Sequence, residues 1–194
     1  MRNFFITLFS LICVYLLWPY VAVFSLFISL KTGDMVGVEE RIDWPSLKKD
    51  LRTDLDKLVE IKLKESLKKE EMQFSFDSLT LSKQISDKIA TPEGLIYLFN
   101  KPNEFVEQIR QIFTNALPPE KINPPVPEKK SFEPEGPNVP DLFERIKYAF
   151  FTEPNSFRLS FNEGDLPFTL DWRLQGIFWK LTRIKIPIEK IWLV

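Results

Sequence analysis

The chain opens with a long apolar segment. No charged residue lies between Arg2 and Lys31, and nearly every position from Phe4 to Leu30 is apolar. A helix over that segment would measure about 40 Å, because each residue adds ~1.5 Å, whereas the hydrocarbon core of a bilayer needs about 30 Å. The segment is therefore longer than one uniform span.

Trp18, Pro19 and Tyr20 lie inside this apolar segment. Trp and Tyr prefer the membrane interface, and proline is tolerated in the first turn of a new helix. We therefore expect a membrane span over residues 3–20, a break at this tripeptide, and a second apolar helix over residues 20–32. That second helix would pack on the soluble domain or lie at the membrane surface.

A cleaved signal peptide is the main alternative, since a short basic start and a long apolar run suit it as well. The small-x-small pattern that precedes cleavage is poor here, with Val21-Ala22-Val23 as its nearest approach. We therefore favour an uncleaved anchor. A basic start before an apolar run also resembles a signal anchor, which predicts that the rest of the chain lies outside the cytoplasm.

Apolar residues then recur at helical spacing. A short helix is expected over residues 35–42, and Asp43 stands in an N-cap position before Trp44-Pro45. Leucines then repeat every three or four positions and predict an amphipathic helix over residues 44–70. The other face of this helix is dense in Lys, Glu and Asp, and we expect it to be solvated.

Shorter elements follow this helix. Residues 72–81 alternate apolar and polar positions, as a strand would, and a short helix is expected over residues 82–90. Thr91 is an N-cap residue before a proline, which predicts a helix over residues 92–99. Apolar spacing predicts a further helix over residues 103–115.

Residues 116–139 are rich in proline and poor in large apolar side chains. This composition is typical of an exposed loop or a semi-rigid linker with polyproline character, which is the interpretation we favour. A proline-rich recognition segment is the functional alternative, because Pro118-Pro119 and Pro124-Pro125 loosely resemble such ligands.

The period of the pattern changes to two in the C-terminal part. Apolar and polar residues alternate over 157–161 and over 168–174, and residues 177–186 contain a third apolar run. Turn residues occur at 162–165 and 175–176. The pattern predicts an antiparallel meander of at least three strands, each with one buried and one wet face.

The composition excludes several classes of function. The chain has 194 residues, with no His, one Cys, 26 Lys plus Arg and 27 Asp plus Glu. A chain without His and with a single Cys has no Ser-His-Asp or Cys-His site, no His- or Cys-based metal site and no internal disulfide. A net charge of −1 gives no electrostatic case for nucleic acid. We expect no metal, no cofactor and no nucleic-acid partner.

These patterns predict an α+β fold with four parts. Residues 1–31 form a membrane anchor with its emerging helix, and residues 32–115 form the helical part of a soluble domain. Residues 116–139 are the proline-rich loop, and residues 140–194 are an antiparallel β meander that completes the same domain as a curved sheet.

Carboxylates are numerous, so acid–base chemistry by an Asp or Glu pair stays open. Asp171 is the best-placed candidate, on the polar face of its strand beside Trp172. A solvated carboxylate that pairs with Arg158, or with neighbours of Arg173 across the sheet, explains it better. No Gly-rich phosphate loop occurs, and we assign no catalytic residue.

Aromatic residues of the C-terminal sheet are the candidates for ligand binding, because they could line an apolar pocket. These residues are Phe157, Phe161, Phe168, Trp172 and Trp179. A core role is the interpretation we favour, since apolar residues at the period of a strand usually face inward.

Several short motifs occur in a fixed order. They are Trp18-Pro19-Tyr20, Gly33-Asp34, Ile42-Asp43-Trp44-Pro45-Ser46-Leu47, the Thr-Pro-Glu-Gly at 91–94 and the Gly-Ile-Phe-Trp-Lys-Leu-Thr-Arg-Ile at 176–184. In this order they resemble the bacterial family named domain of unknown function 2939, over most of the chain apart from the proline-rich stretch and the helix before it. The resemblance implies a membrane-anchored protein of Gram-negative, mostly alphaproteobacterial, bacteria, and it transfers no catalytic residue. Residues 21–30 are more apolar here than in that pattern.

The helix–turn opening and the closing strand are also similar to small cone-shaped α+β folds of the nuclear-transport-factor type. Those folds wrap a curved antiparallel sheet around helices and often hold a pocket. This similarity is one of fold, and fold does not determine function.

We interpret the chain as a single-pass protein of the bacterial inner membrane whose soluble domain is periplasmic. The expected function is a non-enzymatic envelope module that binds a protein partner or a small apolar ligand. The alternatives are a carboxylate-dependent enzyme with a nuclear-transport-factor-like pocket, and a secreted effector whose signal peptide is cleaved. Two convergent carboxylates with raised pKa values would favour the enzyme.

Overall fold

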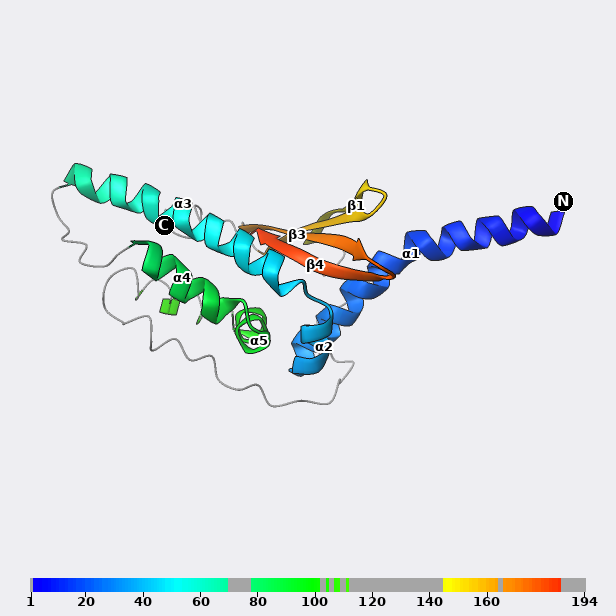
Figure 1. The fold of residues 1–194 in the computed structure, drawn as a ribbon, viewed down its shortest axis with the longest axis horizontal. Coiled ribbons are helices and arrows are strands. Elements are labelled where there is room, and N and C mark those ends of the chain that lie inside the picture. The colour runs from blue at the N-terminus through cyan, green and yellow to red at the C-terminus, as the bar shows by residue number, and fades with distance from the viewer. Residues whose placement is uncertain are drawn as a thin grey trace.

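The computed structural model describes residues 2–69, 78–101, 104, 107, 108, 111, 145–163 and 166–185. They form an α+β fold in which helices precede an antiparallel sheet (Figure 1). The helices are α1 (Arg2–Thr32), α2 (Met35–Glu40), α3 (Trp44–Lys69), α4 (Ser78–Ile89) and α5 (Pro92–Asn100). The strands are β1 (Ile146–Glu153), β2 (Ser156–Glu163), β3 (Leu166–Gln175) and β4 (Phe178–Lys185). The loop expected over 116–139 and most of the helix expected over 103–115 lie outside the described residues.

The four strands pair in the order β1-β2-β3-β4, so each strand lies beside its neighbour along the chain. This order confirms the predicted meander. Gly176 forms the β3–β4 turn with a φ of 64°, a conformation that glycine adopts without a steric penalty. A bulge opposite Asp171 and Trp172 leaves both Leu181 and Thr182 buried on β4. The hydroxyl of Thr182 is satisfied there, because it donates a hydrogen bond to the carbonyl oxygen of Asp171 at 3.1 Å.

α1 continues from Arg2 to Thr32 through Pro19, so the expected break at this proline is wrong. A proline inside a helix removes one backbone hydrogen bond, at a typical cost of about 3 kcal/mol. Here Trp18 and Tyr20 both donate hydrogen bonds to backbone carbonyls of the sheet, and Pro19 itself is buried. Contacts on both sides of the proline therefore hold the helix straight enough to continue.

The two halves of α1 have different surroundings. The N-terminal half projects away from the body of the domain (Figure 1). In the C-terminal half, Leu26 and Thr32 are buried, and the side chain of Asn100 on α5 donates a hydrogen bond to the carbonyl oxygen of Leu30 at 2.9 Å. Leu26, Leu30 and Thr32 therefore pack on the rest of the domain, which is one of the two placements expected for residues 20–32.

A short extended segment places α3 beside the sheet. Ile42 pairs with Leu181 of β4 in parallel orientation, and the N–H of Asp43 donates to the carbonyl oxygen of Leu181 at 2.9 Å. Asp43 then caps α3 as predicted, because its carboxylate accepts a hydrogen bond from the backbone N–H of Ser46 at 3.3 Å. The first turns of α3 consequently start at β4, and the helix runs along this side of the sheet (Figure 1).

α4 begins at Ser78, so the strand expected over residues 72–81 is wrong for its last four positions. Residues 72–77 lie outside the described residues. The buried side chains of α4 are those of Ser82, Ile85, Ser86 and Ile89. Their spacing has the helical period, and because this face packs on α3, it outweighs the short alternation before it.

α5 confirms the predicted helix after Thr91. The hydroxyl of Thr91 accepts a hydrogen bond from the backbone N–H of Gly94 at 3.0 Å, which satisfies a donor of the first turn. The helices and the sheet share one apolar core. Its largest fully buried apolar side chains are those of Trp172, Phe157, Ile42, Leu47, Ile85 and Leu181.

Candidate functional site

The N-terminal half of α1 carries most of the exposed large apolar side chains among the described residues. From Phe4 to Trp18, every residue except Cys13 is exposed. Within the part of the chain that the structure describes, α1 is the one helix long and apolar enough to cross a membrane, a property that signal sequences share. A core helix of a soluble protein would have most of these side chains covered, whereas here they are exposed.

Three aromatic side chains attach α1 to one end of the sheet. The hydroxyl of Tyr15 donates a hydrogen bond to the carbonyl oxygen of Pro154 in the β1–β2 turn. The indole N–H of Trp18 donates to the carbonyl oxygen of Ile177 in the β3–β4 turn at 3.0 Å. Tyr20 donates to a carbonyl oxygen of β1 at 2.8 Å. The end of the sheet that contains these two turns therefore lies directly beside the apolar helix.

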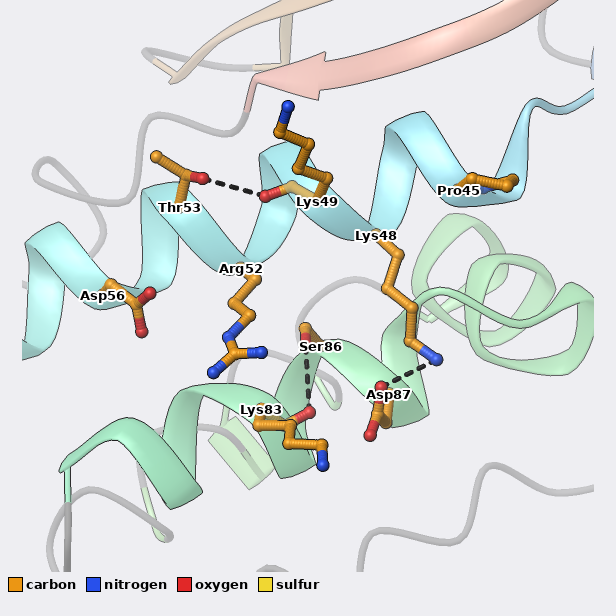
Figure 2. Close-up of a pocket in the computed structure, with 9 residues that line it drawn as sticks. All are labelled: Pro45, Lys48, Lys49, Arg52, Thr53, Asp56, Lys83, Ser86 and Asp87. Atoms are coloured by element: carbon orange, nitrogen blue, oxygen red, sulfur yellow. Dashed lines mark hydrogen bonds and ion pairs between the residues drawn. The ribbon is translucent and has the colours of Figure 1, made fainter.

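A second candidate site is a groove of about 690 Å³ between α3 and α4 (Figure 2). Its lining residues are Pro45, Lys48, Lys49, Arg52, Thr53, Asp56, Lys83, Ser86 and Asp87. The ammonium of Lys48 on α3 lies 2.7 Å from the carboxylate of Asp87 on α4 and bridges the two walls. The side chains of Arg52 and Lys83 form no ion pair with another described residue, and Figure 2 shows Arg52 extending from α3 toward α4.

Sequence reasoning missed this groove because its residues belong to the charged face of α3 that we expected to be solvated. Lys48 and Arg52 recur at a spacing of four and therefore share one side of the helix. That spacing was the available signal. The spacing of Lys48 and Arg52 could not predict the other side of the groove. Lys83 and Asp87 lie on a different helix and come close only when α4 packs on α3.

Asp171 forms a cross-strand ion pair. This is the structural role that we favoured over a catalytic one. Its carboxylate lies 2.6 Å from Nε of Arg158, its register partner on β2. The hydrogen bond with Asp171 and the attraction of its charge raise the pKa of the Arg158 guanidinium above its ordinary value. Among the described residues, no group of three or more Asp, Glu, Cys or His side chains is arranged to hold a metal ion.

Asp43 does more than cap a helix. Besides accepting bonds from Ser46, its carboxylate accepts a hydrogen bond from the side-chain amide of Gln175 on β3 at 2.7 Å. Burial acts to raise the pKa of Asp43, but the hydrogen bonds from Ser46 and Gln175 outweigh it and hold that pKa below its ordinary value. This carboxylate therefore links the start of α3 to the sheet in its charged form.

The five aromatic candidates for ligand binding fall into two groups. Phe157, Trp172 and Trp179 are buried in the core, where the rings of Phe157 and Trp179 meet edge to face. Phe161 and Phe168 are half-buried, and their rings stack at a centroid distance of 5.5 Å. The indole N–H groups of Trp172 and Trp179 have no hydrogen-bond partner among the described residues. A ligand pocket formed by these residues stays a prediction.

No curated protein and no solved structure matches this chain. A family match starts inside α1 and ends inside α5. The motif at residues 176–184, which contributed to the resemblance in the sequence, lies outside the matched region. Residues 8–98 of the chain match the model of the family described as Protein of unknown function (DUF2939).

Proposed function

We propose that this chain is a membrane-anchored protein in which the N-terminal half of α1 enters the bilayer and carries the α+β domain at the membrane surface. The observation that supports this proposal is the projecting half of α1, whose apolar side chains from Phe4 to Trp18 are exposed. An apolar helix of this kind is stable in lipid, where its backbone groups are paired within the helix and its side chains contact hydrocarbon.

The contacts of α1 support a retained anchor over a cleaved signal peptide. Cleavage near Val21-Ala22-Val23 would remove Trp18 and Tyr20, and with them two hydrogen bonds to the sheet. It would also remove the buried Pro19. A peptide destined for removal has no need of specific contacts with the mature domain, so these contacts favour a helix that stays.

Membrane fractionation with an alkaline wash tests the anchor. We expect the full-length protein to stay in the pellet with an intact N-terminus. Leu11→Arg places a charge on the exposed part of α1, which costs about 2.5–3.5 kcal/mol at the centre of a span, and should shift protein to the soluble fraction. Val36→Arg is the matched control, because Val36 is also an exposed apolar residue but lies on α2. Wild-type protein that is soluble and shortened would contradict the anchor and favour a cleaved signal peptide.

The side of the membrane is a separate part of the proposal. A signal-anchor orientation places the α+β domain in the periplasm of the bacterial inner membrane. Paired C-terminal reporters, one active only outside the cytoplasm and one only inside, distinguish the two orientations. Activity of the cytoplasmic reporter would reverse the proposed orientation and leave the anchor unaffected.

The groove between α3 and α4 supports a non-enzymatic binding role for the domain, with a protein partner that presents acidic side chains. Arg52 and Lys83 bring positive charge to this groove, and neither forms an ion pair within the part of the chain that the structure describes. By contrast, an apolar ligand among the five aromatic residues would have to open a core in which Phe157 and Trp172 are almost fully covered. An acid catalyst is less well supported, because Asp171 is paired with Arg158.

Titration with a fluorescent oligoglutamate peptide tests the groove. Arg52→Ala and Lys83→Ala should weaken binding, and added salt should weaken it further because exposed charges are screened. Lys57→Ala is the matched control, since Lys57 is an exposed cation of α3 outside the groove. Equal losses in all three variants would show bulk charge attraction and would contradict a site in the groove.

A further inference from the structure

We propose that the β3–β4 turn enters the interface of the same bilayer as α1, so that the domain contacts phospholipid through the sheet as well as through the helix. This inference rests on the proposed anchoring by α1. It adds a second contact, which would fix the orientation of the domain relative to the membrane rather than leave it to pivot on one helix.

The length of the exposed apolar face of α1 requires the sheet to approach the lipid. Beyond Trp18, this face continues through Val21 and Phe24, which are 61% and 58% exposed. From Phe4 to Phe24 it measures about 30 Å at ~1.5 Å per residue, which equals the thickness of a hydrocarbon core. From Phe4 to Trp18 it measures only about 21 Å. The apolar face thus extends past the level at which the sheet begins, which draws this end of the sheet to the surface of the bilayer. Local thinning of the bilayer accommodates the shorter segment up to Trp18, and Val21 and Phe24 lie in the interface.

The β3–β4 turn presents apolar side chains at this level. Ile177 and Phe178 are 69% and 62% exposed, more than any other large apolar residue of the described sheet. The carbonyl oxygen of Ile177 accepts the hydrogen bond from Trp18, so the β3–β4 turn is held next to Trp18 on α1. Transfer of two adjacent exposed apolar side chains from water to the boundary with the acyl chains lowers the free energy. Trp18 beside them is a residue type that prefers the interface.

Polar residues at the same end of the sheet limit the depth of this contact. Glu153 and Asn155 at the β1–β2 turn are exposed, and so is Arg173 on β3. Charged groups are costly in hydrocarbon but fit among the headgroups, where Arg173 can meet lipid phosphate. The two turns therefore rest at the headgroup level, and Ile177 and Phe178 reach the boundary with the acyl chains.

Depth-dependent quenching tests this placement on the full-length chain. Single cysteines at Phe9, Ile177 and Lys57 are introduced into a Cys13→Ser background and labelled with an environment-sensitive fluorophore. All three sites are exposed, so substitution should leave the fold intact. The labelled proteins are reconstituted into vesicles of phosphatidylethanolamine and phosphatidylglycerol that contain nitroxide-labelled lipids. Lys57 serves as the control because it lies on α3 beyond the groove, and α3 extends away from α1 (Figure 1).

We expect the label at Ile177 to be quenched by lipid nitroxides to an extent comparable with Phe9 and several times that at Lys57. Quenching at Phe9 without quenching at Ile177 would overturn the second contact while the anchor stands. It would indicate that something other than lipid covers the β3–β4 turn. Absence of quenching at Phe9 would overturn the proposed anchor and this inference together.

Discussion

The indole nitrogen of Trp18 lies 3.0 Å from the carbonyl oxygen of Ile177, and this hydrogen bond joins α1 to the β3–β4 turn. The two residues are distant in sequence, yet their contact determines where the projecting helix meets the sheet. Tyr15 and Tyr20 make similar bonds on either side of it. α1 is therefore attached to the domain through side-chain donors and backbone acceptors as well as through apolar packing.

Trp18→Phe should loosen this attachment. The substitution keeps an aromatic ring but removes the N–H donor, and loss of one such bond typically costs about 1 kcal/mol. We expect faster amide hydrogen exchange in the β3–β4 turn. Trp44→Phe is the control, because the indole of Trp44 donates only to the nearby carbonyl oxygen of Glu39. Unchanged exchange at the turn in Trp18→Phe would show that apolar packing alone holds α1.

Gly94→Ala should destabilise the fold more than Gly176→Ala. A Cβ at Gly94 would lie 2.3 Å from the carbonyl oxygen of Lys88 and 2.7 Å from that of Ile89, and backbone atoms have little room to move. We expect a loss of about 2–3 kcal/mol in the free energy of unfolding. A Cβ at Gly176 meets open space, so only the left-handed φ opposes it, at about 1–2 kcal/mol. Denaturant unfolding in detergent micelles measures both, and the reverse order would contradict this account.

Asp43→Ala should destabilise the start of α3. The substitution removes the N-cap and leaves the amide of Gln175 without its partner, and such caps are typically worth about 1–2 kcal/mol. Asp43→Asn should cost less, because asparagine also caps helices. Unfolding by denaturant at neutral pH compares the two variants. Equal losses of stability in the two variants would show that the negative charge of Asp43, rather than its capping hydrogen bond, stabilises the start of α3.

The stability that Asp43 contributes should depend on pH. The pKa of its carboxyl is lowered in the folded protein, so the folded state favours the charged form more than the unfolded state does. The contribution is therefore present above the unfolded pKa of about 3.9 and is lost as the pH falls through the folded pKa. We expect the difference in stability between wild type and Asp43→Asn to shrink below about pH 4. A difference that is constant from neutral to acidic pH would contradict the lowered pKa.

The ion pair between Arg158 and Asp171 should stabilise the fold only slightly. Its side chains are partly exposed, with 47% and 26% of their surface accessible, so water and salt screen the attraction. A double-mutant cycle with Arg158→Ala and Asp171→Ala should give a coupling energy below about 1 kcal/mol that falls with added salt. A much larger coupling would indicate that this pair organises the sheet, which its position on the outer face does not require.

Much of the fold could be predicted locally because the deciding interactions are local. Thr91 and Asp43 cap the helices that follow them through hydrogen bonds that span three residues. The alternation over β2 and β3 predicted the meander because successive strands of an antiparallel sheet pair directly. The pairing of Asp171 with Arg158 followed from the same register.

Other features depended on distant parts of the chain. The alternation before Ser82 favoured a strand, but residues 78–81 form the first turn of α4, a helix that packs on α3. The motif around Pro19 favoured a break, but contacts with the sheet keep α1 continuous. The groove was not predicted, because Arg52 and Lys83 lie on different helices and each one alone resembles a solvated lysine or arginine.

Local sequence patterns are enough to predict a long apolar helix, helices with defined N-caps and an antiparallel sheet, since each depends on the period of apolar residues or on neighbours within a few positions. The division of α1 between the domain and the projecting half, and the end of the sheet that lies beside it, depend instead on long-range packing. Those relationships depend on contacts such as that between Trp18 and Ile177, which join segments that no local pattern connects.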